Sequence, residues 1–199
     1  MGGFRAISRA CIAAFAVLAA AGGHAAEEKR WHTLAACRYV ADKGNDGDNF
    51  IVQCGRDRFH VRLYFVDAPE TDANFPERVR QQYEYFGVTL DELTRAGAKA
   101  RDYVQALLAP RVFVIHTRYS YALGRSKNPR YYGLVEVDGR YLHQILVTEG
   151  LARNKGTTIA LAGQRGRDHA QGLQALEDRA RLERRGVWAT HSGTRRVLK

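Results

Sequence analysis

The chain has 199 residues, with 31 Lys or Arg against 21 Asp or Glu and a formal net charge of +10 at pH 7. This length suits one domain with an appendage and is sufficient to bury a hydrophobic core. Hydrophobic residues make up 45% of the chain and only 4 residues are proline, which excludes intrinsic disorder and a fibrous protein. The positive charge favours a polyanionic partner, with nucleic acid first and an anionic membrane surface second.

The first residues have the pattern of an export signal. Arg5 and Arg9 precede an apolar run over residues 10–21, and small residues follow that run. A basic start, a short apolar stretch and small residues at its end are the parts of a secretory signal peptide. The run is too short to cross a bilayer, which needs about 20 apolar residues. We therefore expect residues 1–25 to be a signal peptide that is cleaved.

The predicted cleavage site follows Ala25, with Ala21 and Ala26 as alternatives. Cleavage removes two arginines and no acidic residue, so the formal charge falls from +10 to +8. No later segment of the sequence is apolar for long enough to span a membrane. We therefore expect a mature protein that is periplasmic or secreted, has no stable membrane insertion and is a monomer.

The cysteines agree with export. Cys11 lies in the predicted signal, which leaves Cys37 and Cys54 as a pair on either side of a Gly- and Asp-rich turn over residues 43–48. Two strands that fold back at this turn would place the two cysteines nearly opposite each other, so a disulfide is feasible in an oxidising compartment. We favour this disulfide over the alternative of two separate buried thiols.

Five short runs have the composition or alternation of β-strands. They are approximately residues 34–41, 49–54, 58–66, 111–117 and 131–137. In the third run, Arg62 is expected on one face with His60 and Tyr64. The opposite, apolar face consists of Phe59, Val61, Leu63 and Phe65. Short strands separated by Gly- and Asp-rich turns favour a small barrel over a parallel α/β sheet.

Three helices are predicted, over approximately residues 89–110, 141–149 and 163–185. The first begins with a capping box at Thr89 and Glu92, and the other two end at Gly150 and Gly186. We expect residues 72–88 to form a polar connection without a helix. All these elements are assigned to one domain over residues 33–190, followed by a basic tail over residues 191–199.

Two acidic motifs stand on either side of the third predicted strand. Asp46-Gly47-Asp48 alone is typical of a turn, and Asp67-Ala68-Pro69-Glu70 alone is typical of a strand exit. An EF-hand that starts at Asp42 is excluded because its twelfth position is Gln53, where calcium needs a bidentate Glu. Neither motif indicates a functional site by itself.

Together the two motifs contain the groups that phosphodiester hydrolysis needs. The reaction requires a cation to offset phosphate charge, a base to activate water and guanidinium groups to hold the phosphate oxygens. Asp48 and Asp67 supply carboxylates for a hard cation, Glu70 follows three residues later, and Arg62 lies on the strand between them. The combination predicts metal-assisted cleavage of a phosphodiester.

These residues resemble the staphylococcal nuclease (thermonuclease) family. Residues 46–71 read D-G-D-N-F-I-V-Q-C-G-R-D-R-F-H-V-R-L-Y-F-V-D-A-P-E-T, which is similar to that family's D-G-D-T, R-L and V-D-T-P-E-T segments. Residues 131–154 resemble its later strand, D-G-K turn and G-L-A helix, and the terminal helix also runs into G-V-W. The resemblance covers about residues 35–190. It implies an α+β fold, an OB-fold-like five-stranded β-barrel with three α-helices.

The resemblance also implies a calcium-dependent nuclease that acts on DNA and RNA and leaves 5′-hydroxyl and 3′-phosphate ends. On this basis Asp48 and Asp67 correspond to calcium ligands, and the backbone carbonyl of Ala68 is a further oxygen ligand. Calcium takes 6–8 oxygens, so water and a substrate phosphate would complete its shell. Asp46 is expected to hydrogen-bond into that shell.

For catalysis, the resemblance makes Glu70 the general base, or the residue that positions the attacking water, and Arg62 a clamp on the phosphate. Counting back from the turn at Asp138 without gaps places the second catalytic arginine at Arg130. Arg125 is the alternative, because Leu-Gly-Arg there imitates the family's Y-G-R motif. We favour Arg130, since its neighbouring strand fixes geometry better than a loop does.

The sequence departs from the family pattern around the substrate. Asn49 stands where the family has Thr, Ala68 also replaces a Thr, and residues 153–157 replace the tyrosines that pack the nucleotide base. Any aromatic face can stack a base, and the candidates are Tyr119, Tyr121, Tyr131 and Tyr132. The residues we expect to contact the substrate are Tyr131, Tyr132, Arg125 and Lys127.

Two other functions fit part of the pattern. The same barrel occurs as a non-catalytic module that binds nucleic acid or protein, but such modules typically lack the carboxylates and arginines that stand here. A basic protein attached to anionic membrane or cell-wall polymers would explain the charge but not the spacing of the carboxylates. The sequence therefore favours an exported nuclease.

Overall fold

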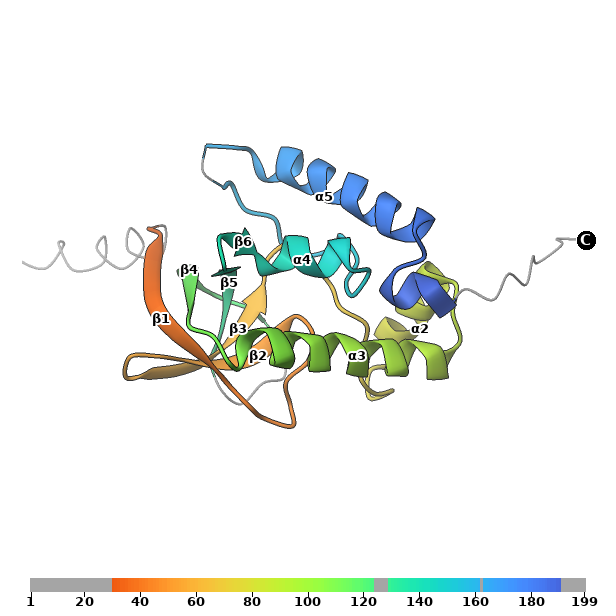
Figure 1. Ribbon diagram of the computed structural model, residues 1–199, viewed down its shortest axis with the longest axis horizontal. Helices are drawn as coiled ribbons and strands as arrows, with labels where there is room; N and C mark the ends of the chain where they lie inside the picture. The colour runs from red at the N-terminus through yellow and green to blue at the C-terminus, as the bar shows by residue number, and fades with distance from the viewer. Residues whose placement is uncertain (1–29, 124–128, 162, 191–199) are drawn as a thin grey trace, which may run out of the picture. The chain divides into compact units, whose positions relative to one another are not determined.

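A ring of five strands forms the centre of the computed structural model, which describes residues 30–123, 129–161 and 163–190. The ring consists of β1 (His32–Val40), β2 (Asn49–Cys54), β3 (Asp57–Leu63), β4 (Phe113–Tyr121) and β5 (Arg130–Val137). The short β6 (Arg140–Tyr141) pairs with β5 outside the ring. Their order is β3-β2-β1-β4-β5-β6, and a parallel pairing of β3 with β5 closes the ring. The fold is the predicted OB-like barrel (Figure 1).

The strand that carries Arg62 is shorter than predicted. It ends at Leu63, and Phe65 adopts a left-handed backbone with φ 72°, which breaks the extended run before the second acidic motif. Tyr64 was expected on the open face with Arg62, but it is only 1% exposed because its ring stacks on that of Tyr132. His60 is also buried, at 9% exposure, so of the three residues predicted opposite the apolar face only Arg62 is partly exposed.

Within the described residues, four α-helices accompany the barrel, together with a 3-10 helix, η1 (Gly186–Thr190). They are α2 (Pro76–Phe86), α3 (Leu90–Leu108), α4 (Leu142–Thr148) and α5 (Gly166–Leu182). In Figure 1, α3 runs beside the barrel, and α4 lies between the strands and α5. Helix α4 packs against α5, and α2 packs against α3. The three predicted helices are thus present as α3, α4 and α5.

Helix α2 corrects the prediction of a helix-free connection over residues 72–88. Pro76 stands in its first turn, where the missing N–H costs no hydrogen bond. Val79, Gln82 and Phe86 recur at helical spacing and form the buried side of the helix. The buried polar Gln82 made this side difficult to recognise as an apolar stripe.

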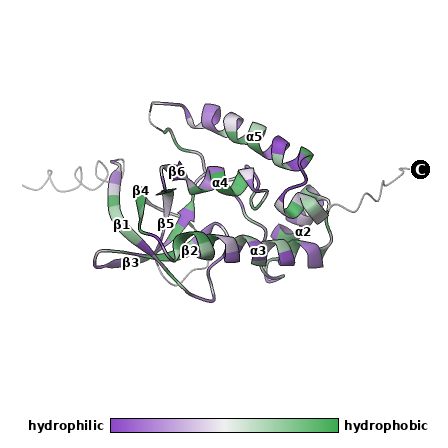
Figure 2. Cartoon of the chain, viewed as in Figure 1, coloured by the Kyte–Doolittle hydropathy of each residue, from purple (hydrophilic) through white to green (hydrophobic). Residues whose placement is uncertain are grey.

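The helices cover the barrel with amphipathic surfaces. Figure 2 shows hydrophobic and hydrophilic residues alternating along α3 and α5. Val104 and Leu108 of α3 and Leu173 of α5 are buried in the same core as the strand residues. No helix in the described part of the chain combines the length and the hydropathy of a membrane span.

The predicted disulfide is present. Cys37 and Cys54 face each other in the register of the antiparallel pair β1–β2, and their sulfur atoms are 2.00 Å apart. The bond closes the hairpin that carries the first acidic motif. Residues 1–29, with the predicted signal peptide, and residues 191–199, with the predicted basic tail, lie outside the described residues.

Candidate active site

The first acidic motif lies in the turn between β1 and β2. Asp46 accepts hydrogen bonds from the backbone N–H groups of Asp48, at 3.0 Å, and Asn49, at 2.6 Å. These bonds fold the turn around one carboxylate and direct Asp48 inward, where it is 1% exposed. The Gly-Asp turn thus buries a carboxylate next to the barrel.

Arg62 joins the two acidic motifs. Its Nη1 lies 2.5 Å from Oδ1 of Asp48, and its Nη2 lies 3.3 Å from Oδ1 of Asp67. The second oxygen of Asp48 accepts the backbone N–H of Ala68 at 2.8 Å. Arg62, Asp48, Asp67 and Ala68, which were predicted to act together, are therefore within contact of one another.

Asp67 is also bound by groups that the sequence did not single out. Arg78 of α2 places Nη2 at 2.7 Å from Oδ1, and Arg153 places Nη2 at 2.7 Å from Oδ2. Gln82 donates to Oδ2 at 3.0 Å and to the carbonyl of Ala68 at 2.9 Å. Arg153 is 2% exposed, so Asp67 and Arg153 form a buried ion pair.

Glu70 lies beside this cluster and is held from two sides. Its Oε1 lies 2.6 Å from Nε of Arg78, and its backbone N–H donates to Oε1 of Gln82 at 2.8 Å. Gly97 of α3 supports it from behind: a Cβ at this position would lie 2.3 Å from the carbonyl oxygen of Glu70. Helix α3 therefore approaches the D-A-P-E segment closely only because residue 97 is glycine.

The carboxyl groups of the site differ in their acidity. Burial raises the pKa of Asp48 well above its ordinary value against the opposing charge of Arg62, and the Asp46 and Asp67 carboxylates raise it further. Burial also raises the pKa of Asp67, but Arg78 and Arg153 outweigh it and the net pKa is lowered. The pKa of Glu70 is raised by burial, with Arg78 opposing. A general base works best when its pKa lies near the operating pH, so a raised pKa makes a carboxylate a better general base at neutral pH.

The oxygen atoms of the site are of the kind that a hard cation binds. Asp48, Asp67 and the Ala68 carbonyl are oxygen donors, the kind that calcium prefers, and buried like charges gain from a cation between them. Among the described residues no group of three or more His, Cys, Asp or Glu side chains has the arrangement of a metal site. Each of these oxygens accepts a hydrogen bond from Arg62, Arg78, Arg153, Gln82 or a backbone N–H. A cation that bound here would replace some of these donors.

Of the two candidates for the second arginine, only Arg130 is described. It is the first residue of β5 and pairs with His60 of β3. Its Nε and Nη2 donate to the carbonyls of Ala122, at 3.1 Å, and Leu123, at 2.5 Å. Burial and the charge of Arg62 lower the pKa of Arg130. Arg125 and Lys127 lie outside the described residues.

A cavity of about 410 Å³ opens beside the carboxylates. Its lining consists of Arg62, Leu63, Val66, Asp67, Arg78, Gln81, Tyr132, Arg153, Lys155, Gly156 and Thr157. Tyr132 contributes an aromatic ring that stacks on Tyr64 with centroids 5.0 Å apart. Tyr131 does not line this cavity and packs instead against Tyr119, Tyr121 and Phe59. The two predicted substrate tyrosines thus face different surroundings.

The comparison with protein families decides the assignment. A family model described as staphylococcal nuclease homologue matches residues 60–190. The chain belongs to this family. Arg62, Asp67, Glu70 and Arg130 lie in the matched range, and Asp48 precedes it. A search of the curated proteins gave no match. Family membership indicates a nuclease-type domain with nucleic acid as its substrate class.

Proposed function

We propose that this family member is an exported, calcium-dependent nuclease that hydrolyses phosphodiester bonds of DNA, RNA or both. The supporting observation is that Arg62 contacts both Asp48 and Asp67 at the edge of a cavity. Arg78 forms ion pairs with both Asp67 and Glu70, which links Glu70 to this cluster. A guanidinium group next to carboxylates is the arrangement that phosphate binding and water activation need.

The proposed reaction is attack of water on phosphorus. Glu70 accepts a proton from the water as its oxygen bonds to phosphorus, or positions that water. Arg62 donates to the phosphate oxygens and stabilises the negative charge that develops on them. The bond from phosphorus to the 5′ oxygen breaks and that oxygen gains a proton, so the products are a 5′-hydroxyl and a 3′-phosphate.

Calcium is proposed to bind to Asp48, Asp67 and the carbonyl of Ala68. When bound, it supplies positive charge that offsets the charge of the phosphate. Asp46 orients Asp48 through its backbone hydrogen bond. Arg62 contacts Oδ1 of Asp48, and Arg78 contacts Oδ1 of Asp67. Calcium at these oxygens would replace the two guanidinium groups, which would then be available to the phosphate.

Two further residues are proposed to bind the substrate. Arg130 is the favoured second arginine, because it begins β5 next to the strand of Arg62. It would turn from the carbonyls of Ala122 and Leu123 toward the phosphate. Tyr132 is the favoured base-stacking residue, because its ring lines the cavity together with Arg62.

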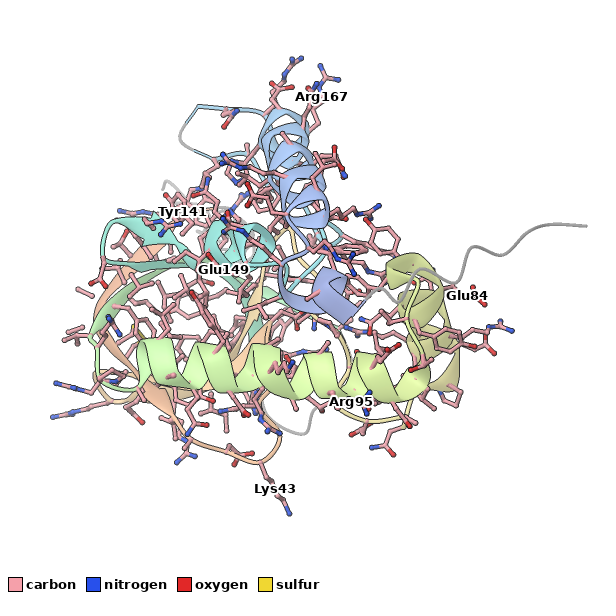
Figure 3. The ribbon with its side chains drawn as sticks, turned by 45° about the vertical axis from the view of Figure 1, so that its right-hand side comes forward. Lys43, Glu84, Arg95, Tyr141, Glu149 and Arg167 are labelled. Carbon is pink, nitrogen blue, oxygen red and sulfur yellow. A yellow bond between two sulfur atoms is a disulfide. The ribbon has the colours of Figure 1, made fainter. Side chains whose placement is uncertain are left out.

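Cleavage by the mature protein, starting at Ala26, tests the proposal. Single- and double-stranded DNA and RNA are incubated with calcium or with a chelator, and Glu70→Gln is compared with Glu84→Gln. Glu84 is an exposed residue of α2 that projects outward from the helix (Figure 3). We expect calcium-dependent cleavage that is lost by at least about 100-fold in Glu70→Gln and unchanged in Glu84→Gln.

The same experiment separates the nuclease from a non-catalytic module. Nucleic-acid binding that persists with chelator, without cleavage under any condition, would support the binding module and contradict the nuclease. Export is tested separately by expressing the full chain in a bacterial host. Recovery outside the cytoplasm with a new N-terminus at Ala26 supports it, and an intact N-terminus in the cytoplasm contradicts it.

A further inference from the structure

One positively charged side chain of the cavity differs from the others in its partner. Arg62, Arg78 and Arg153 each form ion pairs with carboxylates. Lys155 donates instead to Oε1 of Gln81, a neutral amide, at 2.6 Å, and forms no ion pair within the described residues. The cavity therefore contains a positive charge that no acidic group of the described chain compensates.

The backbone holds Lys155 at a fixed place in the cavity wall. On one side, Arg153 and Asp67 exchange both backbone hydrogen bonds, at 3.0 and 3.1 Å. On the other side, the N–H of Phe65 donates to the carbonyl of Thr157 at 3.0 Å. Gly156 permits this approach, because a Cβ there would lie 2.9 Å from the backbone nitrogen of Val66. Lys155 is thus anchored to the segment that leads to Asp67.

Helix α2 positions the lysine side chain. Gln81 of α2 accepts from Lys155 and, at 3.4 Å, from Arg153. Arg78, one turn earlier on the same helix, contacts Asp67 and Glu70. The helix that the sequence did not predict therefore connects the uncompensated lysine with the residues proposed for catalysis.

The cavity has room for more than one phosphate group. Its volume of about 410 Å³ lies in the range of about 300–1,000 Å³ that is typical of cavities for whole small molecules. Arg62 lines it next to the calcium-ligand candidates, and Lys155 and Tyr132 line it as well. An anion at Lys155 would share the cavity with the phosphate at Arg62.

We propose that Lys155, positioned by Gln81, binds a phosphate group of the nucleic-acid strand adjacent to the phosphate that is cleaved. This proposal rests on the proposed nuclease function and adds the substrate class: a strand with at least two consecutive phosphates is preferred over a single phosphodiester. The extra contact contributes binding, so it acts on KM, whereas Arg62 and Glu70 act on the chemical step.

Kinetics on two substrate lengths test this proposal. Wild type, Lys155→Gln and Lys155→Arg are compared on a dinucleoside monophosphate and on oligonucleotides extended by one nucleotide at either end. Lys43→Gln is the matched control, since Lys43 is exposed and projects away from the barrel at the hairpin turn (Figure 3).

We expect one extension to lower KM about tenfold for wild type, which corresponds to about 1.4 kcal/mol for a charge-assisted contact. Lys155→Gln should lose this preference with kcat unchanged, Lys155→Arg should keep most of it, and Lys43→Gln should keep all of it. Equal effects of Lys155→Gln on all substrates, or no effect on any, would overturn the proposal.

A binding experiment without turnover distinguishes this proposal from the nuclease proposal. Affinity for a single-stranded oligonucleotide is measured with chelator over a range of salt concentrations. Loss of one phosphate contact in Lys155→Gln should make the slope of log K against log salt less negative by about 0.7. An unchanged slope overturns the Lys155 site even if the protein cleaves, and a changed slope supports it even if cleavage is absent.

Discussion

Asp67 is the residue at which the contacts of the site meet. It binds Arg62, Arg78 and Arg153 and accepts from Gln82, and it is almost fully buried. Removal of one partner from a buried ion pair leaves an uncompensated charge, which costs more than the pair itself contributes. Asp67 therefore has a structural role beyond its proposed role as a calcium ligand.

We predict that Asp67→Asn lowers the free energy of unfolding by about 3 kcal/mol, because Arg153 would remain buried without a charged partner. Urea unfolding measures this loss. Asp178→Asn, an exposed change on α5, should stay within about 0.5 kcal/mol of wild type. A variant Asp67→Asn as stable as wild type would show that the arginines do not depend on this charge.

The proximity of some residues of this cluster was predictable from the sequence. Asp48, Arg62, Asp67 and Glu70 lie within one hairpin and its exit, so spacing along the chain indicated their proximity. Arg153 meets Asp67 across 86 positions, and no local pattern contains that information. The one sequence signal was the place of Arg153 directly after the G-L-A segment, a few residues beyond the end of helix α4.

At the scale of elements, α2 and α3 determine where Glu70 lies. Helix α3 was predictable because a capping box at Thr89 and helically spaced apolar residues agree. Helix α2 was not, because the residues of its buried side include Gln82, whose amide binds the D-A-P-E segment rather than apolar core. A buried polar residue with a functional partner weakens the periodic pattern on which sequence prediction relies.

Gly97→Ala is predicted to displace the Glu70 segment. The new methyl group would lie 2.3–2.6 Å from backbone atoms of Pro69 and Glu70, so stability should fall by about 1–3 kcal/mol and cleavage should fall with it. Gly172→Ala on α5 meets nothing within 4 Å and should stabilise by up to about 1 kcal/mol. Thermal unfolding and cleavage assays check both. Equal behaviour of the two variants would contradict the close approach of α3.

The disulfide acts on the β1–β2 hairpin. Cys37→Ser combined with Cys54→Ser opens a loop with a sequence separation of 17 residues, for which chain entropy predicts a loss of about 3 kcal/mol. Chemical unfolding of the variant, and of wild type with and without reductant, measures this loss. The stability of the variant should be the same with and without reductant. If the stability of the wild type is also unchanged by reductant, the bond does not stabilise the fold.

On the scale of the whole molecule, helices α4 and α5 are joined by a buried pair of histidines. Nε2 of His143 and Nε2 of His169 are 2.8 Å apart, and the Phe65 ring packs on both. Burial and the neighbouring His169 lower the pKa of His143 to about 3, and burial lowers the pKa of His169. At most one of the two facing nitrogens can carry a proton without loss of this hydrogen bond.

Stability should therefore depend on pH. Both histidines have folded-state pKa values below the unfolded value of about 6.5, so the unfolded chain binds more protons. The stability they contribute is complete above about pH 6.5 and is lost as pH falls toward the folded values, at up to about 1.4 kcal/mol per pH unit for each proton. Unfolding from pH 7 to 4 measures this loss. His143→Leu should flatten the dependence, whereas His32→Gln should not.

The parallel pairing of β3 with β5 has a consequence for the order of folding. The register His60 with Arg130 and Arg62 with Tyr132 joins segments separated by 70 positions, and such distant pairings form slowly because a long loop must close first. We therefore expect the pairing that places Arg62 beside Tyr132 to form late in folding. The proposed nuclease activity should therefore appear only after this parallel pairing has closed the ring, and recovery of cleavage during refolding measures this delay.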